Sequence, residues 1–294
     1  MFMQLLANGL VTGSVIALAA AGVSIVYGIL RLVNFAYGDY MTFGAFTAVY
    51  FNVTLELPIV TATLLAMLAT ALLSVAFELV LWRPLRARNA GFMSLFLVSV
   101  GLALVLRHVI YLVAGPQSRT YTVDPYKVYV IGSARLSGAQ GIAIVVAAVG
   151  IVLVGILIAR TGVGRMMRAL ADDLPLAAVA GVRTSRVILA AWVVSGLLAG
   201  LAGVLAGLVQ TSFDPQLGFT LLLPIFAAVI LGGIGNVYGA LLGGLTLGLV
   251  MELSTWPELH GGVNPTYKPV VAFATLILVL LLRPQGLFGR ARVV

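Results

Sequence analysis

Few residues of this chain carry side chains that could do chemistry, and they stand far apart. The 294 residues include nine acids, two histidines and no cysteine, which excludes disulfides and thiolate metal sites. One histidine, His260, has Glu252 and Glu258 near it, but this trio flanks a loop rich in Pro and Gly, where polar residues are usually solvated. No G-x-x-x-x-G-K-[ST] motif occurs, so the chain has no phosphate-binding loop for ATP. We expect no catalytic residue, no metal site and no cofactor bound by this chain.

Two adjacent polar residues, Arg107 and His108, lie deep inside an apolar run, "GLALVLRHVIYLV". They either line a polar path or reach the outer interface or a neighbouring helix. Carriers coupled to protons or sodium usually hold acids in the middle of a span. We expect none here, because Asp39 stands beside a helix end and Glu252 closes a run. This pattern indicates a transporter that has no coupling group of its own.

The segments that must position these residues are strongly apolar. The chain is 62% hydrophobic and 9% charged, with a mean hydropathy of +1.14, so its solvent must be the bilayer. Its net charge of +8 comes mainly from arginines at the ends of apolar runs. That distribution is typical of membrane orientation and argues against a nucleic-acid partner. We therefore predict a multi-pass protein surrounded by membrane lipid.

Nine apolar segments approach the length of about 20 residues that a bilayer-spanning helix needs. They lie near 5–30, 35–53, 57–82, 92–113, 139–160, 187–210, 219–232, 237–254 and 268–283. Arginines at 83–88, 160–186 and 283–292 place those three regions in the cytoplasm and the N-terminus outside, where "MFMQLLANGL" begins a retained span. The seventh segment contains Pro224 and is either a tilted span or a half-helix. The expected fold is all-α and polytopic, with eight to nine transmembrane helices in a single domain over 1–294.

The stretch "RMMRALADDLPLAAVAGVRTSR", residues 165–186, interrupts this apolar pattern. Asp172 and Asp173 are acids of the kind that cap a helix start, Pro175 fits a first turn, and Gly181 provides a stop. The rod of small apolar residues between them, 176–180, either fits a groove on another protein or lies on the lipid surface. The residues alone favour neither alternative.

Glycines cluster at one further break, "LGGIGN" at 231–236, where one short apolar segment ends and the next begins. Gly232, Gly233 and Gly235 predict an unwound or mobile joint there. Non-helical backbone inside a membrane lines a cavity or is buried in protein. Each of these glycines therefore serves either a path or a purely structural joint.

Several segments resemble, in order, the permease subunits of branched-chain amino-acid ABC importers, the LivH-type family. The matching text begins with "GLVTGSVIALAAAGVSIVYGILRLVNFAYGDYMTFGAF" and "WRPLRAR". It continues with "TGVGRMMRALADDLPLAAVAGV", "GLLAGLAGVLAGL", "FAAVILGGIGNVYGALLGG" and "LLRPQGLFG". Together these segments run from near residue 9 to 289. The resemblance implies an all-helical permease similar to the vitamin-type importers, in a bacterial cytoplasmic (inner) membrane.

The resemblance also implies partners. They are a second homologous permease subunit, two ATP-binding subunits that hold ATP and Mg, and an external or periplasmic substrate-binding protein. The loop at about 161–186 then carries the coupling helix that docks on an ATPase subunit. Its matching residues are Arg165, Arg168, Ala169, Asp172, Asp173, Pro175, Ala177, Ala178 and Gly181. The family commonly has proline directly after the acidic pair, then a glutamate. Here Leu174 intervenes and no glutamate follows. The sequence therefore does not fix which residue caps the helix, because its start can shift by one position.

For the translocation path, the resemblance favours the two breaks in the apolar segments, and Arg107 and His108 are added as the polar residues that lie deep inside a span. The residues at these breaks are Asn34, Tyr37, Gly38, Asp39, Phe226, Gly232, Gly233, Gly235 and Asn236. A path without mid-span charges suits leucine, isoleucine and valine, or other small amino acids or amides. The rival interpretation is a self-sufficient secondary carrier or channel for small amphiphilic solutes or amides such as urea.

Overall fold

A computed structural model describes residues 2–122, 128–131, 134–257 and 262–288. Its helices are α1 (Phe2–Leu30), α2 (Tyr37–Val49), α3 (Ile59–Phe77), α4 (Arg83–Ala87), α5 (Phe92–Ala114), α6 (Gly138–Arg160), α7 (Gly162–Asp172), α8 (Leu174–Val179), α9 (Thr184–Gln210), α10 (Leu217–Gly232), α11 (Val237–Leu253) and α12 (Lys268–Leu282). Short π-helical turns follow α2 at Tyr50–Thr54 and α3 at Glu78–Trp82, and a 3-10 turn, Pro265–Tyr267, precedes α12. Strands β1 (Val128–Ile131) and β2 (Ala134–Ser137) form a small antiparallel hairpin.

Each of the nine predicted apolar segments contains a helix, but the helices differ in length. Within the described residues, six helices are long and apolar enough to cross a membrane: α1, α3 with its extension into α4, α5, α6, α9 and α12. Helices α10 and α11 are apolar but shorter, and α2 has 13 residues. The all-helical, polytopic character is confirmed apart from the hairpin, whereas eight to nine full crossings stays a prediction.

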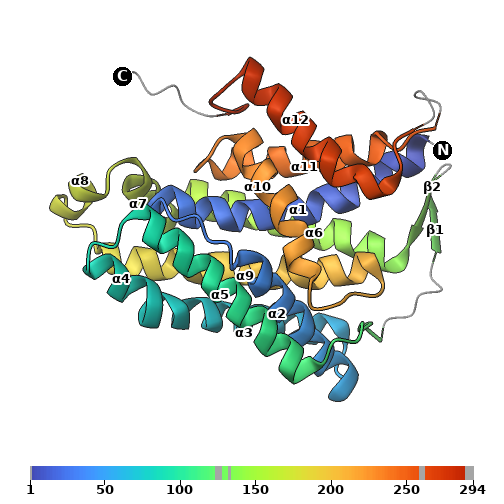
Figure 1. The fold of residues 1–294 in the computed structure, drawn as a ribbon, viewed down its shortest axis with the longest axis horizontal. Coiled ribbons are helices and arrows are strands. Elements are labelled where there is room, and N and C mark those ends of the chain that lie inside the picture. Colours follow the sequence, from blue (N-terminus) through green and yellow to red (C-terminus); the bar gives the residue numbers. More distant parts are fainter. Residues whose placement is uncertain (1, 123–127, 132–133, 258–261, 289–294) are drawn as a thin grey trace.

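Helix α1 lies in the centre of the bundle, where it packs against α11, α9, α10 and α6 (Figure 1). It can do so because its contact faces are built from Gly and Ala, which let helix backbones approach closely. A Cβ added at Gly248 of α11 would lie 2.2 Å from the Cα of Gly13, and one at Gly244 would lie 2.4 Å from the Cα of Ala17. These are backbone-to-backbone contacts that no larger residue permits.

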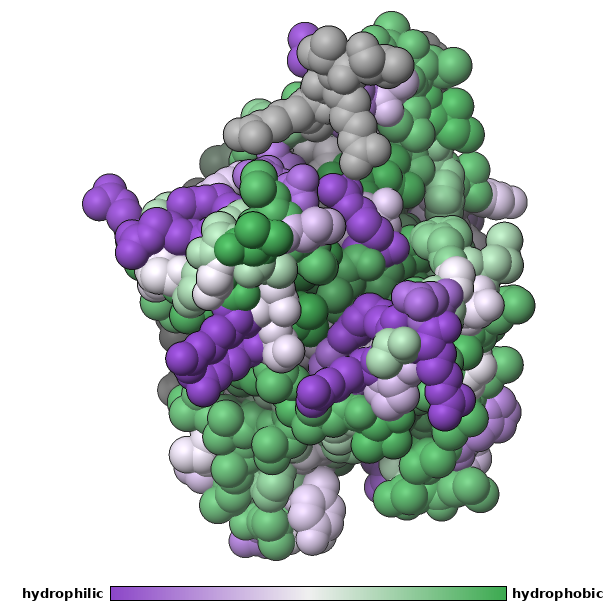
Figure 2. Space-filling view, turned by 90° about the vertical axis from the view of Figure 1, so that its left-hand side faces the viewer, coloured by the Kyte–Doolittle hydropathy of each residue, from purple (hydrophilic) through white to green (hydrophobic). Residues whose placement is uncertain are grey.

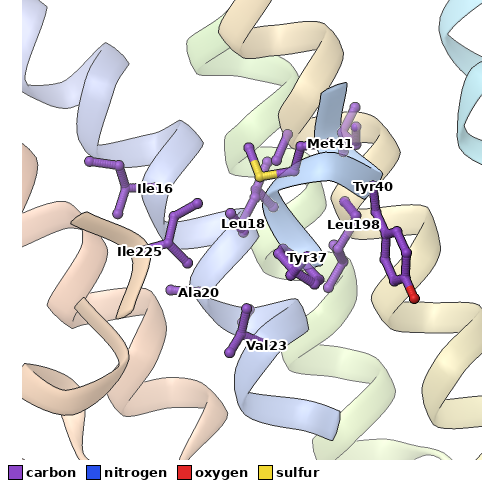
Figure 3. Close-up of a cluster of buried hydrophobic side chains, with 14 of the residues drawn as sticks. Ile16, Leu18, Ala20, Val23, Tyr37, Tyr40, Met41, Leu198 and Ile225 are labelled. Atoms are coloured by element: carbon purple, nitrogen blue, oxygen red, sulfur yellow. The ribbon is translucent and has the colours of Figure 1, made fainter. Parts of the chain in front are cut away.

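Apolar side chains of four helices complete this centre. Figure 3 labels Ile16, Leu18, Ala20 and Val23 of α1, Tyr37, Tyr40 and Met41 of α2, Leu198 of α9 and Ile225 of α10. All of them are buried. The start of α2 is thereby fixed deep inside the molecule and not at its surface.

The two ends of the bundle differ. Helices α4, α7 and α8 gather at one end, and the N-terminus and the β-hairpin lie at the other (Figure 1). The first end carries the arginine-rich segments 83–88 and 160–186, as expected for two loops on the same side of a membrane. Following the predicted orientation, we call it the cytoplasmic end.

We expect Gly248→Leu to lower the free energy of unfolding by about 3 kcal/mol or more, because overpacking at a rigid contact forces the helices apart. The matched control is Gly141→Leu in α6, since a Cβ at Gly141 would meet no atom within 4 Å. Thermal unfolding of both purified variants in mild detergent measures the difference. Equal midpoints would contradict the packing of α1 against α11.

Candidate functional sites

Helices α7 and α8 form a pair of short, individually capped helices at the cytoplasmic end. The Thr161 hydroxyl accepts a hydrogen bond from the Gly164 amide at 3.0 Å, which caps α7. The Asp173 carboxylate accepts one from the Leu176 amide at 2.9 Å, which caps α8. The predicted cap by Asp173 is therefore confirmed. Because Asp173 is the cap residue, α8 begins at Leu174, the residue that separates the acids from Pro175.

Asp172 does not have the predicted position at a helix start. It is the last residue of α7, a helix that the sequence interpretation did not separate from α8. Only one of the two acids can cap, because Asp173 alone has the extended backbone of a cap residue, with φ −151°. Gly181, with φ +84°, follows the end of α8 as predicted.

The pair is fastened to the bundle by small and apolar side chains. Helix α7 buries Gly164, Met167 and Leu170, and α8 buries Ala177. On the outer side of α8, Leu176 is 66% exposed and Val179 is 87% exposed. These two apolar residues stand free at the end of the molecule.

Most residues predicted to dock on a partner are exposed. The exposed ones are Arg165, Arg168, Ala169, Asp172, Asp173, Pro175, Ala178 and Gly181. Ala177 is buried instead, so it holds α8 in place. Val179 belongs to the predicted apolar rod 176–180, although the residues matched to the family leave it out. Figure 2, which looks onto this end, shows hydrophilic residues gathered around apolar ones.

The first predicted path group lies at the start of α2. Asn34 is buried, and its side-chain oxygen accepts a hydrogen bond from the Ala36 amide at 3.1 Å. The Tyr37 hydroxyl donates to the Ser195 carbonyl at 3.4 Å. Gly38 packs directly on the backbone of Gly218, the second residue of α10. The break before α2 is therefore packed against α9 and α10 in this conformation.

Asp39 and Arg107 form an ion pair inside the bundle. The Arg107 Nε donates to Asp39 Oδ1 at 3.0 Å and its Nη2 donates to Oδ2 at 3.2 Å. The Asp39 side chain is 1% exposed and that of Arg107 12%. The Arg107 guanidinium also stacks over the ring of Phe219, 4.1 Å from its centroid.

We predicted no acid in the middle of a span, and this is confirmed for Asp39, which lies in the first turn of α2, although its side chain is buried inside the bundle. Glu78, bonded by Arg86, and Glu252, 2.7 Å from Lys268 Nζ, are buried in the same way. All three acids are neutralised by a cation of the same chain. His108 does not join Arg107 at the ion pair: it is exposed on α5, and its Nδ1 lies 2.7 Å from the Leu104 carbonyl.

The second predicted path group lies at the joint between α10 and α11. Gly233 and Gly235 have φ of +104° and +84°, the left-handed region that favours glycine. The side chain of Asn236 accepts from the Gly239 amide at 3.1 Å, which caps α11, and donates to the Phe288 carbonyl at 3.0 Å. The joint is unwound as predicted, and Gly232 packs on the backbone of Gly239.

Phe226 does not lie with these glycines. Its ring centroid is 5.1 Å from that of Phe35, at the first break. The structure thus brings one residue of the second group to the first, through a pair of aromatic rings. The remainder of the two groups stays apart.

A cleft of about 590 Å³ connects the second break with the coupling segment. Its lining includes Arg31, Arg168, Asp172, Gly235 and Asn236. Arg31 donates to the Ala171 carbonyl at 3.3 Å, and Arg168 donates to the Ile158 carbonyl. The end of α7 and the joint between α10 and α11 therefore line the same cleft at the cytoplasmic end.

Some predicted features fall elsewhere. Glu258, His260, Arg290 and Arg292 lie outside the described residues. Among the residues that the structure describes, no group of three His, Asp or Glu side chains could hold a metal ion.

Long apolar helices in backbone contact, buried ion pairs and a capped helical pair at one end define a polytopic helical membrane protein. The chain belongs to the family described as branched-chain amino acid transport system / permease component, which matches residues 5–280. The predicted resemblance is confirmed. So is the prediction of a multi-pass permease of the inner membrane that is one component of a transport system.

Individual relatives agree over almost the whole chain. It is 32% identical to the high-affinity branched-chain amino acid transport system permease protein LivH of Escherichia coli, covering 99% of this chain and 97% of the relative. It is also 32% identical to the corresponding protein BraD of Pseudomonas aeruginosa, with the same coverage. A chain of PsaBC from Streptococcus pneumoniae in complex with Fab has a similar fold, with a TM-score of 0.51 at 14% identity, covering 97% of this chain and 93% of that one.

Proposed function

We propose that this chain is the membrane-spanning permease of an ATP-driven importer of branched-chain, or other small and mainly apolar, amino acids. An external binding protein delivers the amino acid, and ATP-binding subunits on the cytoplasmic side supply the energy. Family membership supports the transport role and the amino-acid substrate. The chain binds no ATP of its own in this proposal.

The observation that carries the ATP-driven part is the outer face of α8. Leu176 and Val179 are exposed beyond the bundle on a helix held from behind by Ala177 and capped by Asp173. An apolar helix face fixed in this way suits a groove on another protein. The lipid-surface alternative is less suited, because the exposed acids Asp172 and Asp173 stand at the start of the same helix, and anionic headgroups repel them.

The cleft next to α7 supports a route for the mechanical signal. Movement of α8 by an ATPase would shift α7, whose end is bonded to Arg31 and lines the same cleft as Gly235 and Asn236. The unwound joint is where a helix end can change direction with little strain, because glycines absorb changes in φ and ψ. The coupling helix would in this way open or close the cytoplasmic exit.

We expect an ATP-binding subunit to co-purify with the tagged chain from its native membrane in mild detergent. Replacing residues 172–180 by a Gly/Ser linker should remove that subunit, because the apolar face of α8 is then missing. Mass spectrometry of the eluate measures it, and immunoblotting of the membranes checks that the variant is inserted. A wild-type chain that elutes without any ATP-binding subunit would favour the self-sufficient carrier or channel.

A further inference from the structure

The cleft of about 590 Å³ at the cytoplasmic end combines charged and apolar residues in its lining. Arg31 directly follows α1, whereas Arg168 and Asp172 belong to α7. The apolar residues come from α6, from the joint and the start of α11, and from the segment after α12: Ile158, Ile234, Val237 and Phe288. A hollow of this size, apolar with a few placed charges, is typical of a site for a small molecule.

Both guanidinium groups of the cleft are held in place by backbone carbonyls. Arg31 donates to the Ala171 carbonyl at 3.3 Å, and Arg168 donates to the Ile158 carbonyl. A guanidinium has five N–H donors, so each retains free donors after the one bond that it makes within the described part of the chain. Because both groups are already positioned, they can bind a carboxylate with little further loss of side-chain freedom.

Asp172 does not neutralise these arginines. It stands four positions after Arg168 on the same face of α7, a spacing at which opposite charges can pair. Among the residues that the structure describes, however, no ion pair includes Arg31, Arg168 or Asp172. The cleft therefore presents its positive and its negative charge separately.

Arg31 is placed in the cleft by an unusual backbone conformation. Its amide donates to the Tyr27 carbonyl at 2.8 Å, directly after the end of α1, and its φ is +53°. Glycine or asparagine is usual at such a helix end, because other side chains are strained in the left-handed region. Strained residues of this kind cluster at ligand clamps and switch regions. The strain at Arg31 is thus a second indication that the cleft holds a ligand.

We infer that the cleft binds a free branched-chain, or other small apolar, amino acid from the cytoplasm, and that the bound amino acid slows further import. The inference rests on the proposed function, because the ligand is the imported product. Arg31 and Arg168 bind its carboxylate, Asp172 binds its ammonium group, and the apolar residues contact its side chain. A simple anion is repelled by Asp172, and a simple cation is repelled by the arginines. Only a molecule that carries both charges satisfies the lining.

The position of the cleft explains how such a ligand acts. The amino acid connects the end of α1 with α7 and lies beside the joint at Gly235 and Asn236. It therefore stabilises the arrangement of these elements that the structure shows, and a ligand shifts a conformational equilibrium toward the state that it binds better. When the amino acid accumulates in the cytoplasm, α7 is held in this position and transport slows.

The first test measures binding of leucine to the importer complex in lipid nanodiscs, without ATP and without the external binding protein. We expect saturable binding that Arg31→Asn weakens at least about tenfold, as loss of a charge-assisted hydrogen bond does. Asparagine tolerates the left-handed backbone at this position, so the variant should fold, and its thermal unfolding midpoint checks this. The matched control is Arg160→Asn, which removes an exposed arginine at the end of α6 that does not line the cleft.

Two analogues test recognition of both charges in the wild-type complex. 4-Methylpentanoate lacks the ammonium group of leucine, and 3-methylbutylamine lacks its carboxylate. Each should bind at least about tenfold more weakly than leucine. Equal binding of either analogue and leucine would overturn the inference. The same holds for equal binding of leucine by the wild type and Arg31→Asn, and for the absence of saturable binding.

The second test measures regulation in right-side-out membrane vesicles that contain ATP, with or without millimolar unlabelled leucine inside. The initial rate of labelled leucine uptake is measured with the binding protein outside, and each variant is compared with itself. Internal leucine should slow uptake several-fold in the wild type and Arg160→Asn, but not in Arg31→Asn. No slowing in the wild type, or equal slowing in all three, would overturn the regulatory role.

The same experiments separate this inference from the proposed function. ATP-dependent uptake without leucine binding at the cleft sinks the inference alone. Uptake that needs no ATP and is accelerated by internal leucine indicates exchange by a self-sufficient carrier and sinks the proposed importer. Binding of leucine to the wild-type and Arg31→Asn chains in nanodiscs then still decides whether the cleft is an amino-acid site.

Discussion

Val179→Arg should reduce uptake of a branched-chain amino acid to less than about a tenth of the wild-type rate, while the protein still inserts and folds. Val179 is 87% exposed on α8, so the substitution disturbs no contact within the chain. If this side chain fills a groove on the ATPase, the charge is forced into an apolar site, and central contacts of that kind contribute about 2 kcal/mol or more to docking. A loss of that size corresponds to roughly thirty-fold weaker docking.

The matched control is Ala87→Arg, which adds the same charge to an exposed position at the same end, but on α4. Its uptake should stay near wild type. Uptake into membrane vesicles with binding protein and ATP is compared with ATP hydrolysis by the same vesicles. Wild-type uptake by Val179→Arg, or an equal loss in both variants, would show that α8 is not the docking element.

The sequence alone locates α8, because caps and stops are local signals. Asp173 caps the start of α8 and Gly181 follows its end. Each acts on backbone groups only three or four positions away, so a short stretch of sequence is enough to recognise it. The sequence does not tell which side of so short a helix faces outward. Ala177 and Val179 are both small and apolar, and only the packing of α8 against the bundle buries one and exposes the other.

The helices of the bundle were predictable for a similar reason, since long apolar runs leave no alternative in lipid. The pairing of charges was not. Asp39 and Arg107 are 68 positions apart, and no local pattern links them. The break before α2 and the contact of Gly38 with α10 bring Asp39 to α5. The sequence offers only two separate indications of the pair: Arg107 lies deep inside one apolar run, and Asp39 lies beside the break before another.

Asp39→Asn should cost about 3–5 kcal/mol of stability, because it leaves the Arg107 charge buried without its partner. Both groups are held away from water, at 1% and 12% side-chain exposure. Thermal unfolding of the purified protein measures the loss, which should appear as a much lower midpoint or a low yield of folded protein. Arg119→Met is the control, because Arg119 is exposed and, among the residues that the structure describes, its guanidinium bonds a carbonyl, that of Ala114, and no acid.

The double variant Asp39→Asn/Arg107→Met distinguishes a structural pair from one that also acts in transport. Removing both charges abolishes the unpaired charge, so stability should return to within about 1–2 kcal/mol of wild type, as when a buried pair is replaced by neutral groups. A double variant that is stable and transports normally would assign the pair to packing alone. If it is stable but transports poorly, the charges that lie beneath Phe219 serve the path as well. A double variant no more stable than Asp39→Asn would contradict the pairing itself, because the penalty would then not come from a charge left without its partner.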